Sequence, residues 1–254
     1  MNRFSVVLRK HGAGVALKAV LCLVAAVTAL IGSAPSAQSA DALINLQFGG
    51  SDATAYTGAA VIGSEGDFWN LKTGGSKTNT SLLSSTGANT GVTVSFTSQY
   101  FGAVSPDQPG SFGFYGTSYA DLMQGYIYAF DGTPRSISFS GLAASSSYSV
   151  YVYTQGDSGA TDRQLTITTN GTTYTALPSV ATESTFVASQ NYLALTGISD
   201  AQGVLTLTYN FAAGEANINA VQVNGPVAVP EPSTCLLLGV SAIAGIGLLR
   251  RRRS

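Results

Sequence analysis

Apolar and polar residues alternate along the middle of this 254-residue chain, in short runs that recur about every ten residues. A period of two is typical of a strand with one buried face, and strands at this spacing are typical of a sandwich. We therefore expect an all-β fold, an antiparallel β-sandwich. The pattern predicts strands at residues 43–48, 92–97, 126–130, 136–140, 148–154, 165–169, 172–176, 192–196, 204–210 and 218–223.

Turn residues separate the predicted strands. Asn170-Gly171 favours a type I′ hairpin, because both central positions of that turn need a positive φ angle. Asp131-Gly132 marks another turn. Residues 118–124 are the one segment of this region that favours a helix. These elements together predict a single sandwich domain at residues 41–226, a usual size for one domain.

The first 40 residues have the three parts of a secretory signal peptide: a basic region, an apolar core at residues 19–31, and small residues with a proline. Cleavage after Ser39 and cleavage after Ala40 both fit the pattern. An uncleaved anchor is the alternative, but the core is shorter than the ~20 residues of a membrane span. We therefore expect residues 1–40 to direct export by Sec-type machinery.

Residues 227–254 form a second terminal segment. Pro230, Glu231 and Pro232 are extended, because proline has no amide donor and disfavours helix in the residue before it. Residues 235–249 are uncharged and mostly apolar, and they predict a short transmembrane helix. A basic cluster then stops transfer and stays in the cytoplasm, which places the domain outside. This cluster is Arg250, Arg251, Arg252 and Arg253.

The order of these C-terminal features resembles the PEP-CTERM sorting signal of Gram-negative bacteria. The resemblance implies recognition by the membrane enzyme exosortase and processing near Pro230, Glu231 and Pro232. It also implies transient contact with the inner membrane, and then a place at the cell surface or in an extracellular matrix of exopolysaccharide and biofilm. An ordinary single-span anchor is the alternative, but it requires neither the two prolines nor so short a helix.

The charge of the middle domain excludes one class of partner. Between residues 41 and 229 there are four basic and twelve acidic residues, a net charge of −8. Nucleic-acid binding begins with a basic patch, so we expect no nucleic-acid partner.

Cysteine and histidine are confined to the ends of the chain. Cys22, Cys235 and His11 all lie outside the middle domain. Ser-His-Asp and Cys-His catalysis and the usual zinc ligand sets are therefore excluded from that domain. We expect a protein that is not an enzyme and that has no cofactor.

Two groups of aromatic residues are candidates for a ligand surface. Tyr126, Tyr128 and Phe130 share one face of a predicted strand, as do Tyr151 and Tyr153 on another. Such a face suits the stacking of sugar rings, although a core or a cross-strand ladder of aromatic side chains produces the same spacing.

The only tryptophan of the chain, Trp69, lies beside Asp67 and Asn70. If it is exposed, these three residues form a candidate sugar contact. If it is buried, the indole fixes its loop to the core, which is the interpretation we favour.

An oxygen-rich loop at residues 156–162 is a weak candidate for structural calcium, with Asp157 and Asp162 as ligands. It has fewer ligands than a dedicated calcium loop. The domain as a whole resembles galactose-binding-like jelly-roll modules of exported bacterial proteins, on pattern alone. The resemblance implies a jelly-roll-like sandwich, and such modules bind carbohydrate in many cases.

Three functions fit the sequence. The first is an exported surface or matrix protein that binds carbohydrate without acting on it. The second is a polysaccharide hydrolase or lyase, since paired carboxylates support glycosidase chemistry without histidine. The third is an adhesive or filler protein with no defined ligand. The sorting signal and the missing catalytic residues favour the first.

The domain is expected to fold without any redox requirement, because it contains no cysteine. Its melting temperature, measured by circular dichroism, should be the same with and without dithiothreitol. A shift caused by the reductant would contradict this expectation.

Overall fold

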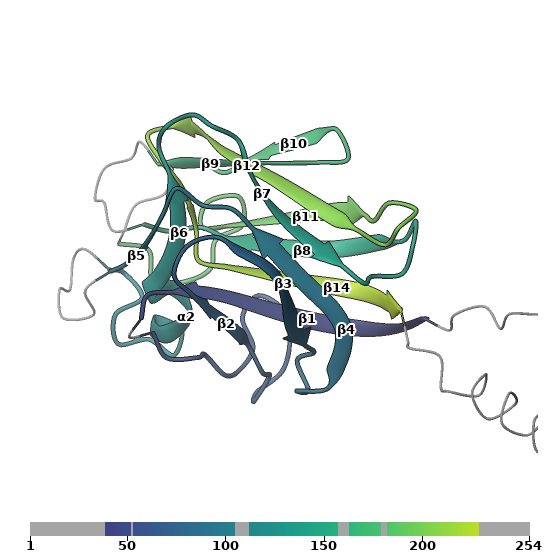
Figure 1. Cartoon of the computed structure of the whole chain (residues 1–254). Coiled ribbons are helices and arrows are strands. Elements are labelled where there is room, and N and C mark those ends of the chain that lie inside the picture. Colours follow the sequence, from purple (N-terminus) through teal and green to yellow (C-terminus); the bar gives the residue numbers. More distant parts are fainter. Residues whose placement is uncertain (1–38, 52, 105–111, 157–162, 179–181, 229–254) are drawn as a thin grey trace, which may run out of the picture. The chain divides into compact units, whose positions relative to one another are not determined.

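A computed structural model describes residues 39–51, 53–104, 112–156, 163–178 and 182–228 of the chain (Figure 1). Strands account for nearly all the secondary structure in these ranges, and the expected antiparallel sandwich is confirmed. None of the helices in the described part of the chain is long and apolar enough to span a bilayer. The transmembrane helix expected at residues 235–249 lies outside the described residues.

Two large sheets form the sandwich. The five-stranded sheet has the order β11 (Tyr192–Ile198), β8 (Ser147–Tyr153), β14 (Ala220–Ala228), β1 (Ser39–Gly49) and β2 (Asn70–Thr73). The six-stranded sheet has the order β10 (Thr172–Thr175), β9 (Gln164–Thr169), β12 (Leu205–Ala213), β7 (Arg135–Ser140), β4 (Asn89–Phe96) and β3 (Lys77–Leu83). All these neighbours pair antiparallel except β1 and β2, which are parallel.

A small third sheet lies at one end of the sandwich. It has the order β13 (Ala216–Ile218), β6 (Gly125–Ala129) and β5 (Tyr100–Ala103), and the short helix α2 (Ala120–Gln124) leads into β6. The first residue of β1 and the last residue of β14 lie at the opposite end of the domain (Figure 1). These two residues, Ser39 and Ala228, are direct cross-strand partners.

The main core fills the space between the two large sheets. Alternate residues of β1 point into it, Ile44, Leu46 and Phe48, and each is at most 1% exposed. Phe48 of one sheet meets Phe96 of the other in an edge-to-face contact, with ring centroids 4.9 Å apart. This alternation is the pattern from which the strands were predicted, and it explains why most of their positions are correct.

A second, largely aromatic core lies apart from the first. It includes Tyr56, Trp69, Phe114 and Tyr153, with Phe186 packed against them. Tyr153 belongs to β8, but its side chain points away from the main core, which Val150 and Val152 of the same strand enter. The outer surface of β8 is therefore covered at this end by segments outside the strands.

Buried amide side chains attach these covering segments to the sheet. Gln47 of β1 is fully buried, and its Nε2 donates to the carbonyl oxygens of Thr54 (3.1 Å) and Asp121 (2.7 Å). Its Oε1 accepts from the amide of Tyr56 at 2.8 Å. Asn219 acts in the same way, and its Nδ2 donates to the carbonyl of Met123. Each amide thereby supplies hydrogen-bond partners to backbone groups of the covering segments.

The amide row also continues across the sheet. Asn45 and Gln222 are cross-strand partners on β1 and β14, and Gln222 Nε2 donates to Asn45 Oδ1 at 2.8 Å. Tyr153 on β8 donates its hydroxyl to Gln222 Oε1 at 2.5 Å and accepts from the amide of Val61. Burial raises the pKa of Tyr153 well above its usual value, so the phenol keeps its proton as a donor.

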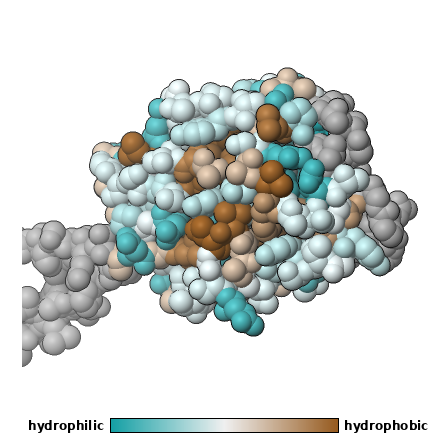
Figure 2. Space-filling model, turned by 180° about the vertical axis from the view of Figure 1, so that it is seen from behind, coloured by the Kyte–Doolittle hydropathy of each residue, from teal (hydrophilic) through white to brown (hydrophobic). Residues whose placement is uncertain are grey.

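Figure 2 shows the face of the domain that is hidden in Figure 1. Hydrophobic residues gather near the centre of this face, and more hydrophilic residues surround them.

The Gln47 amide is expected to be essential for stability. Gln47→Leu keeps the size of the side chain but removes the partners of one buried amide and two part-buried carbonyls, and an unsatisfied buried group costs about 1–3 kcal/mol. We expect a loss of about 2–5 kcal/mol in the free energy of unfolding, measured by urea denaturation. The matched control is Gln202→Leu at an exposed position, which should change stability by less than about 0.5 kcal/mol. Equal effects of the two variants would show that the amide does not hold the covering segments.

Candidate functional site

Trp69 is buried and does not present a face to a ligand. The side chain is 1% exposed, and its Nε1 donates to the carbonyl oxygen of Gly58 at 2.9 Å. The indole meets Tyr56 and Tyr153 in edge-to-face contacts, with ring centroids 5.6 and 6.3 Å apart. Trp69 therefore fixes its loop to the second core, as the favoured interpretation stated, and the sugar contact centred on Trp69 is wrong.

The two neighbours of Trp69 are also structural. Asn70 is 5% exposed, and its Nδ2 donates to the carbonyls of Asn45 and Leu83 while its Oδ1 accepts from the amide of Leu83. It thereby joins β1, β2 and β3. Asp67 closes its own turn, since its Oδ2 accepts from the amide of Ser64 at 3.0 Å.

Several predicted site residues lie outside the described residues: Asp157, Asp162, Pro230, Glu231, Pro232, Arg250, Arg251, Arg252 and Arg253. Among the residues that are described, no group of three His, Cys, Asp or Glu side chains could hold a metal ion. The calcium loop thus stays a prediction.

The strand that begins at Tyr126 carries an exposed aromatic surface. Tyr100 of β5 is the cross-strand partner of Tyr128 on β6, and Phe130 follows directly after β6. Tyr100 is 47% exposed and Phe130 is 51% exposed, while Tyr128 between them is half-buried. We call these three residues the aromatic pad. The sequence pattern identified Tyr128 and Phe130 but not Tyr100.

The three rings form a compact, offset cluster rather than a column, and Phe130 is stacked against both tyrosines. Their centroids are 5.4 Å apart for Tyr100 and Tyr128, 5.6 Å for Tyr100 and Phe130, and 6.2 Å for Tyr128 and Phe130. In a face-to-face column, one of the three distances would be about twice the others. The interplanar angles are only 17–31°, so the rings share one general orientation. The pad is therefore a cluster of similarly oriented rings in which Tyr100 and Phe130 are the exposed members, and exposed rings can pack against flat apolar groups.

Tyr126 supports one side of the pad and is itself buried, at 5% exposure. Its ring lies over Gly102, its partner on β5, and a Cβ at Gly102 would come within 3.1 Å of the ring carbons. Glycine at this position lets the aromatic row continue across β5 and β6.

Polar groups surround the pad. The Gln99 Oε1 accepts from the amide of Phe130 at 2.9 Å, which fixes the backbone at the end of the strand. Arg135 forms two hydrogen bonds to the carboxylate of Asp131, at 2.7 and 2.8 Å. This bidentate pair holds the pKa of Asp131 well below its usual value, so the carboxylate is ionised beside the pad.

The other aromatic pair from the sequence is not a platform. Tyr153 is fully buried in the second core, and Tyr151 is half-buried beside Tyr192, with centroids 6.4 Å apart.

The outer face of the six-stranded sheet is a second unusual surface. The strand register aligns rows of uncharged polar side chains across the middle of this face, none of them buried. Some hydroxyls pair with each other, as in Ser138 with Thr206 and Thr168 with Thr173. We call this the hydroxyl face. It consists of Ser81, Thr93, Ser95, Ser136, Ser138, Ser140, Thr166, Thr168, Thr173, Thr175, Thr206, Thr208 and Asn210.

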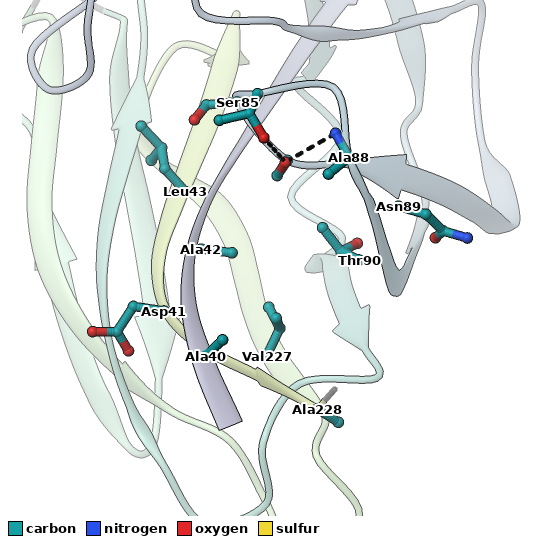
Figure 3. Close-up of a pocket in the computed structure, with 12 residues that line it drawn as sticks. Ala40, Asp41, Ala42, Leu43, Ser85, Ala88, Asn89, Thr90, Val227 and Ala228 are labelled. Carbon is teal, nitrogen blue, oxygen red and sulfur yellow. Dashed lines mark hydrogen bonds between the residues drawn. The ribbon is translucent and has the colours of Figure 1, made fainter. Parts of the chain in front are cut away.

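A shallow pocket of about 380 Å³ lies at the other end of the domain, where β1 begins and β14 ends (Figure 3). It is lined by the first residues of β1, by the 84–90 turn between β3 and β4, and by Val227 and Ala228. Ala40 and Ala42 point toward the pocket, whereas Asp41 points away from it (Figure 3). Its walls are small side chains with few charges, and they do not form a catalytic arrangement.

The family model of the PEP-CTERM protein-sorting motif matches residues 228–253 of the chain. The resemblance seen in the sequence is therefore confirmed for the C-terminal segment. The motif marks the chain as an exported protein of a Gram-negative bacterium that exosortase sorts to the surface. No curated protein and no solved structure matches the chain, so the jelly-roll resemblance stays a prediction.

The burial of Trp69 can be checked by fluorescence, because the chain has no other tryptophan. The native emission should be blue-shifted and insensitive to acrylamide, and it should move to long wavelength in urea. Native emission that already resembles the urea-unfolded protein would place the indole in solvent and contradict the structure.

Processing is expected to depend on the proline pair of the sorting motif. Replacing Pro230, Glu231 and Pro232 with alanine should leave full-length protein in the membrane fraction, detected by immunoblotting against the domain. The control is Ala212→Arg, a change at an exposed position of the folded domain outside the motif. Normal processing of the alanine variant would contradict the assigned role of the motif.

Proposed function

We propose that the exported domain binds neutral extracellular polysaccharide through the aromatic pad and does not cleave it. The observation that carries this proposal is the arrangement of Tyr100, Tyr128 and Phe130 as one exposed surface of similarly oriented rings. Exposed aromatic side chains gathered at one place in this way are uncommon on a surface without a binding role. The proposal extends the sorting assignment, which says where the protein is delivered.

The chemistry of the pad suits a sugar ring. One side of a pyranose carries C–H groups, and an aromatic ring offers them a flat apolar surface. The hydroxyls at the rim of the sugar then need polar partners. Tyr100 and Tyr128 have phenol groups that can donate and accept, and the Asp131 carboxylate is an acceptor beside Phe130.

Charge favours a neutral polysaccharide over an anionic one. The span from residue 41 to residue 229 has a net charge of −8, which would repel uronic acids or sulfated sugars. The one arginine next to the pad, Arg135, is already paired with Asp131.

The hydroxyl face supports the same class of partner. It contains no ionised side chain, so a polymer can approach it without the cost of desolvating a charge. Serine and threonine hydroxyls both donate and accept, and they rotate to suit the partner. A surface of this kind is compatible with a matrix that is itself rich in hydroxyl groups.

The ion pairs of the carboxylates near the pad support a binding role rather than a hydrolytic one. Asp131 is held by Arg135 in a bidentate pair, and Glu215 contacts Arg163 at 3.4 Å and accepts from Asn217 at 2.7 Å. A glycosidase requires one carboxyl group to act as an acid, and an ion pair with arginine opposes protonation.

The pad can be tested by substitution. Tyr100→Ala and Phe130→Ala should each weaken binding to an immobilised neutral polysaccharide about tenfold, which corresponds to about 1.4 kcal/mol. Tyr115→Ala is the matched control, because Tyr115 is 48% exposed but is not part of the pad. All three variants should keep the melting temperature of the parent. A panel of neutral and anionic polysaccharides, with depletion measured by pull-down, identifies the class.

The same polysaccharide panel distinguishes a binding protein from a hydrolase and from an adhesive or filler protein. New reducing ends after incubation would show a hydrolase. Absence of binding to every polysaccharide, by a folded domain, would leave an adhesive or filler protein without a defined ligand. Equal binding by the pad variants and by Tyr115→Ala would contradict the pad as the site.

A further inference from the structure

The last strand of the domain runs directly into the sorting motif. β14 ends at Ala228, and the match to the motif begins at that same residue. The strand is paired with β1 up to Pro226, the partner of Asp41, and Asp41 stays on the domain after cleavage at either expected site. Only Val229 separates the strand from Pro230. The folded domain and the processing signal therefore have no linker between them.

The end of β14 is also firmly held. Val227 is 7% exposed and bridges to Leu142 of the facing side of the domain. The carbonyl oxygen of Pro226 accepts from the hydroxyl of Tyr148 at 2.5 Å and from the amide of Ala143 at 3.2 Å. Releasing these residues would expose Val227 and break both hydrogen bonds, so the strand resists being drawn out as an extended substrate.

Chain length then limits how far an enzyme at the motif can be from the domain. Consecutive Cα atoms are about 3.8 Å apart, so the Cα of Pro230 lies within about 8 Å of that of Ala228. From Ala228 to the apolar segment at residue 235 the fully extended chain spans at most about 25 Å. An enzyme that binds residues 230–232 at the membrane surface is much larger than these distances, so it meets the folded domain.

We infer that exosortase recognises this precursor in part through the end of the folded domain that surrounds Ala228, in addition to the motif itself. The contact surface includes the shallow pocket beside the strand end, with Ala42 and the exposed turn at residues 86–89 (Figure 3). Its small, mostly uncharged side chains leave room for a projecting group of the enzyme and require no charge to be buried.

The position of this contact fixes the orientation of the domain during sorting. β14 is roughly 27 Å long at ~3.4 Å per residue, and the third sheet with the aromatic pad lies beyond its first residue, Ala220. The end with the pad is therefore the end of the domain far from Ala228 and from the proposed contact (Figure 1).

Pulse-chase processing of the full-length precursor, in a host that contains exosortase, tests the contact. Ala88 is exposed in the turn that lines the pocket, so Ala88→Arg and Ala88→Glu should each slow conversion to the processed form at least fivefold. Ala212→Arg, at an exposed position near the end of β12 that leads toward the third sheet, is the matched control and should be processed at the parental rate. Melting temperatures of the isolated variants show that each one folds. Parental processing of both Ala88 variants would overturn the inference.

A linker insertion distinguishes a contact that aids recognition by exosortase from a domain that only blocks access to the motif. Ten glycine and serine residues placed between Ala228 and Val229 move the domain away from the motif. If the contact aids recognition, the insertion slows processing of the parent and removes the effect of Ala88→Arg. If the insertion leaves processing of the parent unchanged or accelerates it, the domain does not aid recognition and the inference is wrong.

Discussion

The row of buried amide side chains on the five-stranded sheet is the constraint on which the rest of the structure depends. Gln47, Asn45 and Gln222 lie on the side of the sheet that faces away from the main core, and Asn219 directly precedes β14, yet each is fully buried. A sheet of a two-layer sandwich normally shows polar residues to water on that side. Here irregular segments cover them, and the amides provide the hydrogen bonds that the backbone of those segments needs. Without the amides, covering the sheet with irregular chain would bury unsatisfied donors and acceptors.

This covering explains where the functional surfaces are found. The second core takes up Trp69, Tyr153 and several other large aromatic side chains, so these are removed from any role in binding. The third sheet lies at the same end but presents its pad to solvent, because Tyr100 and Phe130 occupy positions that no covering segment buries. The opposite end carries both strand termini, Ser39 and Ala228, as cross-strand partners. The end of the domain that continues into the sorting motif and the end that carries the aromatic pad are thus separated by the length of β14.

The sequence predicts the sandwich well because its strands alternate strictly. The hairpin at Asn170-Gly171 is confirmed, with φ angles of 48° and 78°, and nine of the ten predicted strand segments each match one strand, with changes at their ends. Residues 218–223 proved to be parts of two strands, β13 and β14. Three short strands, β2, β3 and β5, were not predicted; β3 carries little apolar alternation and is irregularly paired.

The candidate site was harder to predict than the fold, because it depends on contacts between segments that are far apart in the sequence. Gln47 and Gln222 alternate with apolar residues and therefore look solvent-facing, and nothing local shows that distant segments cover them. Tyr100 is separated from Tyr128 in the sequence and joins it only through strand pairing. Trp69 has polar neighbours that suit a ligand, but Asn70 binds the backbone of adjacent strands and Asp67 closes its own turn.

The central functional claim is that a neutral polysaccharide contacts the domain at the aromatic pad. The most direct measurement is a titration of the isotopically labelled domain with a neutral oligosaccharide, followed by amide chemical shifts in two-dimensional NMR spectra. The pad predicts saturable shifts confined to residues 99–102 and 126–131, with the amides around the pocket at residues 84–90 unchanged. Shifts centred on another surface, or no shifts with any oligosaccharide that the panel identifies, would contradict it.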